Sequence, residues 1–174
     1  MKEILQESQT IYDGRILRLD VETVQLPNQE LTKREIVRHR PAVAVLAVQD
    51  GQYYLIRQYR RAVDEVLIEV PAGNMEESDS LAAGKRELRE ETGITAKNWD
   101  YLGGYYLSPG FCDEYMYFYL ATDLSFGDTE LDDDESCELF SVDKTEFEGL
   151  LGSGKVKDAK TILAFQLAQS KLGV

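Results

Sequence analysis

Three acidic side chains, Glu87, Glu90 and Glu91, are spaced to bind a hard divalent cation. They lie within residues 81–93, where apolar residues recur at helical spacing, so the three carboxylates share one helix face. Like charges placed this way cost about 0.2–0.5 kcal/mol per pair, so helix formation alone does not favour them. Mg²⁺ takes oxygen ligands and commonly bridges carboxylates to substrate phosphates. The alternative interpretation is a solvated acidic face, which is typical of a lone Glu-Glu pair.

The carboxylates belong to a longer pattern, R-E-x-x-E-E-x-G, that runs from Arg86 to Gly93. Five fixed residues at roughly 6% usage each match by chance about once per million windows. This run resembles the second half of the Nudix box, G-x5-E-x7-R-E-U-x-E-E-x-G-U. Gly73 precedes Arg86 by 13 positions, one fewer than in the box, so the first box glutamate has no exact counterpart. The nearest residues are Glu77, Ser78 and Asp79. The resemblance implies that this glutamate pairs with Arg86, so the departure affects that pair rather than the metal site.

Four further stretches resemble the ADP-ribose pyrophosphatase branch of the Nudix family. They are Ile56–Arg60, Glu69–Gly73, Ser108–Gly110 and Asp158–Ile162. With them the resemblance covers most of the chain, and the box is its specific part. The resemblance implies a Mg²⁺-dependent hydrolase, with Mn²⁺ as a substitute, that cleaves ADP-ribose to AMP and ribose 5-phosphate.

The resemblance also implies roles for single residues. Glu87, Glu90, Glu91 and the Ala72 carbonyl would hold the metal, which makes Glu91 one of the two residues that we expect to be catalytic. The other is the base that activates water. A carboxylate on the acidic loop before the last strand could supply it, and Glu135 matches the family position best. Asp133 is the alternative base.

Substrate contacts are expected from arginines, because guanidinium groups bind phosphate bidentately. Arg57, Arg60 and Arg61 fall within five residues of an otherwise acidic chain and form a candidate diphosphate clamp. Their alternative role is ordinary strand-end charge. Arg34 is a weaker candidate, and the resemblance implies that Glu114 contacts the adjoining ribose.

Two other functions remain open from the sequence. The substrate could be another nucleoside diphosphate sugar or an oxidised nucleotide. The domain could instead be a non-catalytic sensor that binds ADP-ribose. The intact set of three glutamates favours hydrolysis, because a sensor has no need of three repelling carboxylates. The sugar, the phosphorus attacked and the number of metal ions are left open.

Composition excludes several classes of protein. A net charge of −13 argues against nucleic-acid binding, which needs clustered lysine and arginine. Cys112 and Cys137 form no C-x-x-C motif, and with His39 as the single histidine no zinc cluster is available. No leader pattern and no 18-residue apolar run stand out, so we expect a cytoplasmic protein with reduced thiols that binds no membrane.

The order of elements indicates an α+β fold. Strands are expected at residues 15–26, 33–40, 42–48, 52–59, 66–70, 99–107, 115–122 and 137–142. Helices are expected after a cap at Ser78, Asp79 or Ser80, and after Asp143 and Asp158. Gly93 suits the position just past the end of the first helix, and Asp50-Gly51 predicts a hairpin turn. The resemblance implies a Nudix-like α/β/α sandwich around a mixed β-sheet, with an N-terminal antiparallel β-hairpin. We expect residues 1–40 to form this hairpin region and to pair across a homodimer, where the partner would help to close the nucleotide pocket. Residues 41–174 would form the Nudix hydrolase domain, in one globular unit with the N-terminal region.

Overall fold

A computed structural model describes residues 1–76, 78–130 and 136–172 of the chain. The chain divides into two compact units. The N-terminal unit comprises Met1–Pro41 and Tyr105–Tyr115, and the second unit comprises Ala42–Gly104 and Met116–Val174. Each unit is described by itself.

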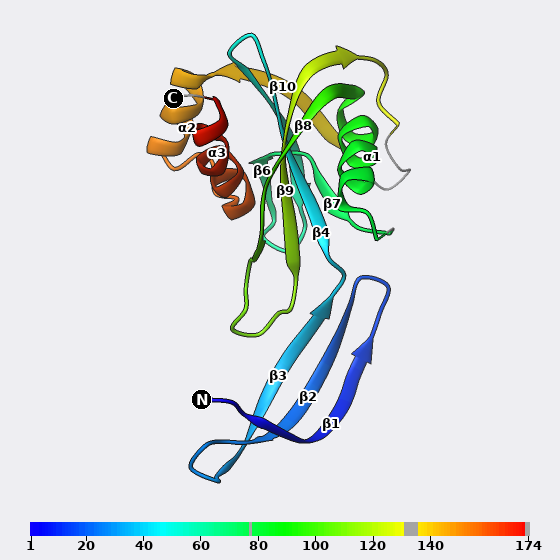
Figure 1. Cartoon of the computed structure of the whole chain (residues 1–174), viewed down its shortest axis with the longest axis vertical. Helices are drawn as coiled ribbons and strands as arrows, with labels where there is room; N and C mark the ends of the chain where they lie inside the picture. The colour runs from blue at the N-terminus through cyan, green and yellow to red at the C-terminus, as the bar shows by residue number, and fades with distance from the viewer. Residues whose placement is uncertain (77, 131–135, 173–174) are drawn as a thin grey trace. The chain divides into compact units, whose positions relative to one another are not determined.

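The N-terminal unit is built on a three-stranded antiparallel sheet in the order β1-β2-β3 (Figure 1). Its strands are β1 (Ile4–Asp13), β2 (Leu17–Gln25) and β3 (Leu31–His39). The predicted antiparallel pairing of β2 with β3 is confirmed, and β1 adds a third strand that the sequence did not indicate. The loop after Ser108 joins this sheet, since the Val37 amide donates to the Phe111 carbonyl at 2.8 Å and the Asp113 amide to the Val37 carbonyl at 3.1 Å.

The second unit contains a seven-stranded sheet in which β10-β5-β4-β9-β8 lie in order, while β6 pairs with β5 and β7 with β4. Strands β4 and β9 are parallel, whereas β5 pairs antiparallel with its neighbours, so the sheet is mixed as predicted. The strands are β4 (Ala42–Gln49), β5 (Gln52–Arg60), β6 (Glu65–Glu69), β7 (Ala72–Asn74), β8 (Ile94–Tyr106), β9 (Tyr115–Phe126) and β10 (Cys137–Asp143).

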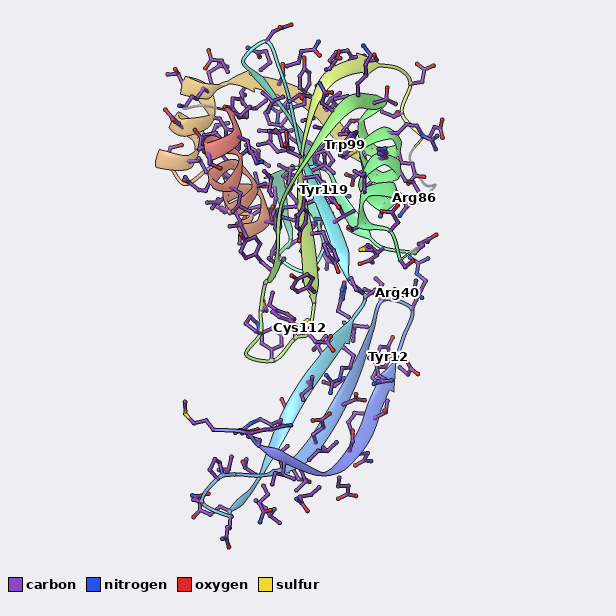
Figure 2. All side chains as sticks on the ribbon, in the orientation of Figure 1. Tyr12, Arg40, Arg86, Trp99, Cys112 and Tyr119 are labelled. Carbon is purple, nitrogen blue, oxygen red and sulfur yellow. The ribbon has the colours of Figure 1, made fainter. Side chains whose placement is uncertain are left out.

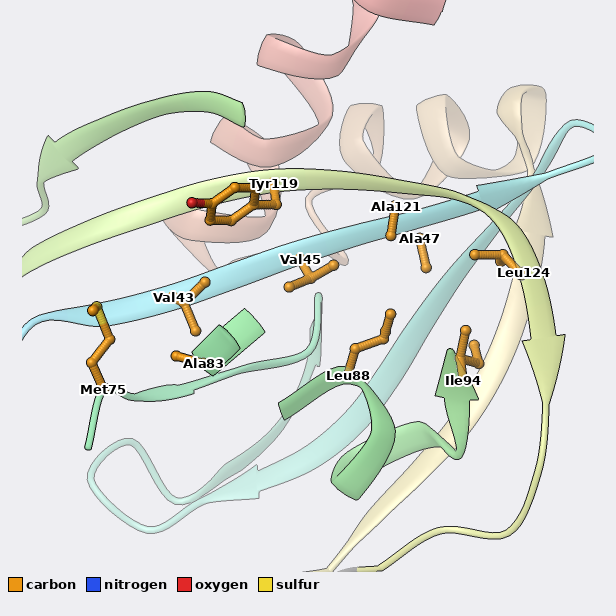
Figure 3. Packing of buried hydrophobic residues seen from close by; sticks show 10 residues of the cluster. All are labelled: Val43, Val45, Ala47, Met75, Ala83, Leu88, Ile94, Tyr119, Ala121 and Leu124. Atoms are coloured by element: carbon orange, nitrogen blue, oxygen red, sulfur yellow. The ribbon is translucent and has the colours of Figure 1, made fainter. Parts of the chain in front are cut away.

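Helices cover both faces of this sheet. Figure 1 shows α1 (Ser80–Thr92) on one side and α2 (Lys144–Gly152) with α3 (Ala159–Leu172) on the other. Strand β4 is buried from Ala42 to Val48, as expected for a strand between two helical layers. In Figure 3 its side chains Val43 and Val45 pack toward Ala83 and Leu88 of α1. Within the described residues, no helix is long and apolar enough to cross a membrane.

Acidic caps fix where the helices begin. The Asp79 carboxylate accepts from the amides of Leu81 and Ala82 at 2.9 and 3.3 Å. Asp143 forms a capping box with Glu146, which stabilises the first turn of α2. The end of α1 also follows the prediction, because Gly93 adopts the left-handed conformation, with φ of 69°, that favours glycine.

Candidate active site

Two of the three acidic residues of α1, Glu87 and Glu91, lie on its buried face rather than on a solvated one. Gly84 and Leu88 mark the stripe that packs on the sheet, and Glu87 and Glu91 continue the same stripe. Only 8% of Glu87 and 3% of Glu91 is exposed, while Glu90 beside them is partly exposed. Buried carboxylates are costly unless their charge is compensated, so the solvated-face interpretation fails for this pair.

Arg86 of α1, which is labelled in Figure 2, compensates the charge of Glu87. Its Nη1 donates to the Glu90 carboxylate at 2.7 Å, and its Nη2 lies 2.7 Å from Glu87 Oε1 and 3.1 Å from the Asn74 carbonyl oxygen. Burial alone would lower the pKa of Arg86, but the two carboxylates outweigh it and the pKa is raised. Arg86 therefore has partners on its own helix and on β7, and Asp79, a neighbour of the missing box position, serves as the helix cap.

The short strand β7 lies directly against the acidic face. The Ala72 amide donates to Glu91 Oε2 at 2.9 Å, which fixes one oxygen of that carboxylate. A Cβ atom built on Gly73 would stand 2.2 Å from the Glu87 carboxyl carbon, so this glycine permits the close approach of Glu87 to the backbone. The Pro71 carbonyl accepts from the Val45 amide at 2.9 Å, which ties this segment to β4.

The donors gathered here suit a hard cation. Carboxylate and backbone carbonyl oxygens are the ligands that Mg²⁺ and Mn²⁺ prefer, and the predicted set of Ala72, Glu87, Glu90 and Glu91 offers only these. In the part of the chain that the structure describes, no three acidic, histidine or cysteine side chains form a ready-made metal cluster. The Arg86 guanidinium bridges Glu87 and Glu90 here. By donor chemistry, the residues fit the metal.

Of the three clustered arginines, Arg60 is the one whose pKa is affected by a carboxylate of α1. Its Nε and Nη2 donate to the Glu69 carboxylate at 2.7 and 2.6 Å. The pKa of Arg60 is raised chiefly by this hydrogen bonding, and the charge of Glu91 contributes as well. Arg60 therefore lies within electrostatic reach of α1.

The other two arginines make surface contacts, the arrangement that the strand-end interpretation predicts. Arg57 donates to Glu138 at 3.0 Å and its guanidinium carbon lies 3.9 Å from the centre of the Phe140 ring. Arg61 pairs with Asp64 at 3.0 Å, and its side chain is almost fully exposed.

Two predicted substrate residues belong to the N-terminal unit. Arg34 donates to both oxygens of Glu3, at 2.6 and 3.2 Å, and lines a hollow of about 340 Å³ together with Arg38 and Phe111. Glu114 has one oxygen 3.9 Å from the His39 ring. The predicted base Glu135 and its alternative Asp133 lie outside the described residues.

Sequence reasoning missed a polar cluster around Glu69, which is 1% exposed. Its carboxylate meets Arg60 on one side and Lys160 of α3 on the other. Both residues sit in stretches that we matched to the family branch, but the match gave them no partner. A charged residue inside the apolar strand 66–70 is the signal that could have identified the cluster.

Comparisons with known proteins agree on one kind of domain. The NUDIX domain model matches residues 38–165. The chain is 42% identical over 165 residues to the ADP-ribose pyrophosphatase of Bacillus subtilis (strain 168), covering 92% of this chain and 89% of that protein. It is 36% identical over 167 residues to the methanol dehydrogenase activator of Bacillus methanolicus, covering 94% and 90%. A crystal structure of an ADP compounds hydrolase superposes with a TM-score of 0.90 at 22% identity, covering 99% of this chain and 95% of that one, which shows the fold.

Proposed function

This chain belongs to the NUDIX domain family, and on that premise we propose that it is a Mg²⁺-dependent pyrophosphohydrolase that cleaves ADP-ribose to AMP and ribose 5-phosphate. The observation that carries the proposal is the burial of Glu87 and Glu91 against β7. Helix stability gives no reason to bury two carboxylates there, whereas binding a cation does.

In the proposed reaction, Glu87, Glu90, Glu91 and the Ala72 carbonyl would hold the metal. When bound, Mg²⁺ neutralises diphosphate charge and lowers the pKa of a coordinated water. The chain's own residues orient the reactants. The Ala72 amide keeps one Glu91 oxygen fixed at 2.9 Å, so the carboxylate cannot rotate freely. The attacking water would bond to one phosphorus while the bridging P–O bond breaks and its electron pair leaves on the oxygen of the departing phosphate. Glu135 would orient this water or take its proton.

Four residues are proposed to contact the substrate. Arg60 and Arg57 of the second unit would bind phosphate oxygens, with Arg60 the stronger candidate because Arg57 already pairs with Glu138. In the N-terminal unit, Arg34 would contact the nucleotide and Glu114 the adjoining ribose. These assignments rest on the family resemblance. For the arginines they also rest on the guanidinium N–H donors that the contacts described above leave available.

A second candidate function is the activation of a dehydrogenase, and one comparison supports it. The methanol dehydrogenase activator covers as much of the chain as the ADP-ribose pyrophosphatase does, so overall similarity alone does not choose between their activities. Another nucleoside diphosphate sugar, an oxidised nucleotide, or sensing of ADP-ribose without hydrolysis are the alternatives. The buried carboxylate pair favours catalysis, because a sensor needs no such pair.

We also propose a homodimer in the cytoplasm. Every residue of β1 is exposed in the single chain, including the large apolar side chains of Ile4, Leu5, Ile11 and Tyr12. An apolar edge strand is commonly covered by a partner. Neither Cys112 nor Cys137 forms a disulfide within the described residues, which suits a reducing compartment. Light scattering at micromolar concentration tests the assembly, and a fully active monomer would count against it.

The activity is tested by a hydrolysis screen with Mg²⁺ over ADP-ribose, other nucleoside diphosphate sugars and oxidised nucleotides. We expect ADP-ribose to be cleaved fastest, with AMP and ribose 5-phosphate as the products. Tight binding of ADP-ribose without products would instead support the sensor.

The catalytic base is tested separately. Glu135→Gln should lower kcat by roughly 10²–10⁴ with little change in substrate affinity. Asp133→Asn is the matched control, and a large loss there alone would move the base to Asp133.

A further inference from the structure

A neutral cluster of four charged side chains lies on the face of the second unit that α3 covers. Glu69 is held by Arg60, through Nε and Nη2, and by the ammonium of Lys160. Lys160 also lies 3.1 Å from Asp158, whose carboxylate accepts from the Thr161 amide in the first turn of α3. Glu69 and Lys160 are buried, so neither can exchange its partner for water without cost.

The cluster uses only part of Arg60. A guanidinium has five N–H donors in one plane, and Glu69 takes two of them, one on Nε and one on Nη2. Among the residues that the structure describes, Nη1 makes no hydrogen bond, and 39% of the Arg60 side chain is exposed. Both donors of Nη1 and one of Nη2 therefore remain. One N–H of each of these two nitrogens lies on the end edge of the guanidinium, directed away from Glu69. That edge is a fork suited to two oxygens of a phosphate.

Lys160 determines how firmly Glu69 can hold this fork. Its ammonium and Arg60 Nη2 share the same oxygen, Oε2 of Glu69. With Lys160 in place the carboxylate is fixed from the α3 side, and the plane of the Arg60 guanidinium is fixed in turn. Without it, Glu69 would keep Arg60 as its one cationic partner in this cluster and could rotate with it.

We propose that Lys160 is a positioning residue that acts through Glu69 to orient the free edge of Arg60 toward a substrate phosphate. The expected effect on kinetics rests on the proposed function. The expected effect on the orientation of the Arg60 guanidinium does not. A purely structural Lys160 would stabilise the fold and leave Arg60 and substrate affinity unchanged.

The test compares Lys160→Met with Lys157→Met. Lys157 lies three residues earlier and forms an exposed ion pair with Glu65 at 2.6 Å, so its loss controls for charge. The first readout is hydrogen exchange of the Arg60 Nε–H by NMR, with the signal assigned by its disappearance in Arg60→Lys. We expect exchange to accelerate at least about tenfold in Lys160→Met and to stay unchanged in Lys157→Met, because a hydrogen-bonded donor is protected until its partner moves.

The second readout is kinetic. Lys160→Met should raise KM for ADP-ribose about tenfold while kcat and the Mg²⁺ requirement change less than about threefold, since a misplaced binding group weakens substrate binding. In the Arg60→Met background, Lys160→Met should have no further effect on KM, because the two residues act in series. If Lys160→Met does not fold, Lys160→Leu, which likewise removes the ammonium, takes its place.

The outcomes separate the two hypotheses. A wild-type protein that does not hydrolyse ADP-ribose overturns the proposed function, and the Nε–H exchange still decides the role of Lys160. Unchanged exchange in a folded Lys160 variant overturns the positioning role, even if the variant is less stable. Additive effects of the two substitutions on KM also overturn it.

Discussion

In the N-terminal unit, Arg34 and Glu3 pair with 42% and 36% of their side chains exposed, whereas in the second unit Glu69 meets two cations with 1% exposed. The first pair is screened by water and contributes little to stability. The second exchanges full hydration for mutual compensation, so removing one member leaves a buried charge. The comparison indicates that the buried Glu69 cluster fixes the geometry of its members, whereas the exposed Arg34–Glu3 pair can change its geometry at little cost.

The apolar residues of the two units differ in the same direction. All of β1 is exposed, whereas β4 is buried along nearly its whole length. The second unit thus has its own hydrophobic core, which packs α1 against β4. This packing places Glu87 and Glu91 beside β7. The N-terminal sheet is held by strand pairing and by ion pairs such as those of Arg38 with Asp20, Glu22 and Asp113.

The largest expected change in stability comes from Glu69→Gln, which should cost about 3 kcal/mol at neutral pH by leaving two cations without their carboxylate. Burial alone would raise the pKa of Glu69, but Arg60 and Lys160 outweigh it and lower the pKa below the ordinary 4.5. Its stabilisation is therefore present above that value and lost as the pH falls through the folded pKa. Urea unfolding of wild type and variant measures the difference, which should shrink below pH 4.5.

The matched control is Glu138→Gln, which removes an exposed partner of Arg57. Its cost should stay below about 1 kcal/mol at every pH. Equal losses for Glu69→Gln and Glu138→Gln would erase the distinction between buried and exposed charge on which the comparison depends.

A smaller effect is expected at the contact of β7 with α1. Gly73→Ala introduces a methyl group at the position now occupied by the Glu87 carboxylate, so that carboxylate must move. We expect kcat/KM for ADP-ribose to fall about tenfold or more, because small displacements of catalytic groups are costly. Gly149→Ala in α2, where a Cβ meets open space, should leave activity unchanged. Steady-state kinetics of the two variants checks this, and equal activity would place Glu87 outside the reaction.

The smallest expected effect lies in the N-terminal unit. Glu3→Gln removes the exposed partner of Arg34 and should change the free energy of unfolding by less than about 1 kcal/mol. Chemical denaturation at low and at high salt measures it. A loss comparable to that of Glu69→Gln would mean that this pair is buried in solution, as a partner subunit could cause.

Local signals in the sequence predicted much of the second unit. Asp79 caps α1 and was one of its three candidate caps, Gly93 follows the end of α1 as predicted, and both residues of the predicted Asp50-Gly51 turn have positive φ. Strand β1 was not predicted, because all ten of its residues are exposed and no alternation of buried and exposed positions marks it. Strand β7 was not predicted, because three residues are too few to show the alternation that indicates a strand.

The site was predictable in its residues but not in their contacts. The motif identified Glu87, Glu90 and Glu91, and their shared helix face follows from spacing alone. It could not show that Glu87 and Glu91 are buried, or that Ala72 offers its amide to Glu91. The cluster of Glu69 with Lys160 joins residues 91 positions apart, which only the packing of α3 on the sheet brings together.

The most direct test of the account is a Mg²⁺ titration of AMP release from ADP-ribose by wild type and Glu91→Gln. The wild type should be inactive in chelator and saturate with added Mg²⁺. Glu91→Gln, which keeps an oxygen to accept from the Ala72 amide, should melt at nearly the same temperature and yet be at least about 100-fold slower at saturation. A Glu91→Gln variant that turns over normally, or a wild type that releases no AMP at any Mg²⁺ concentration, would contradict the account.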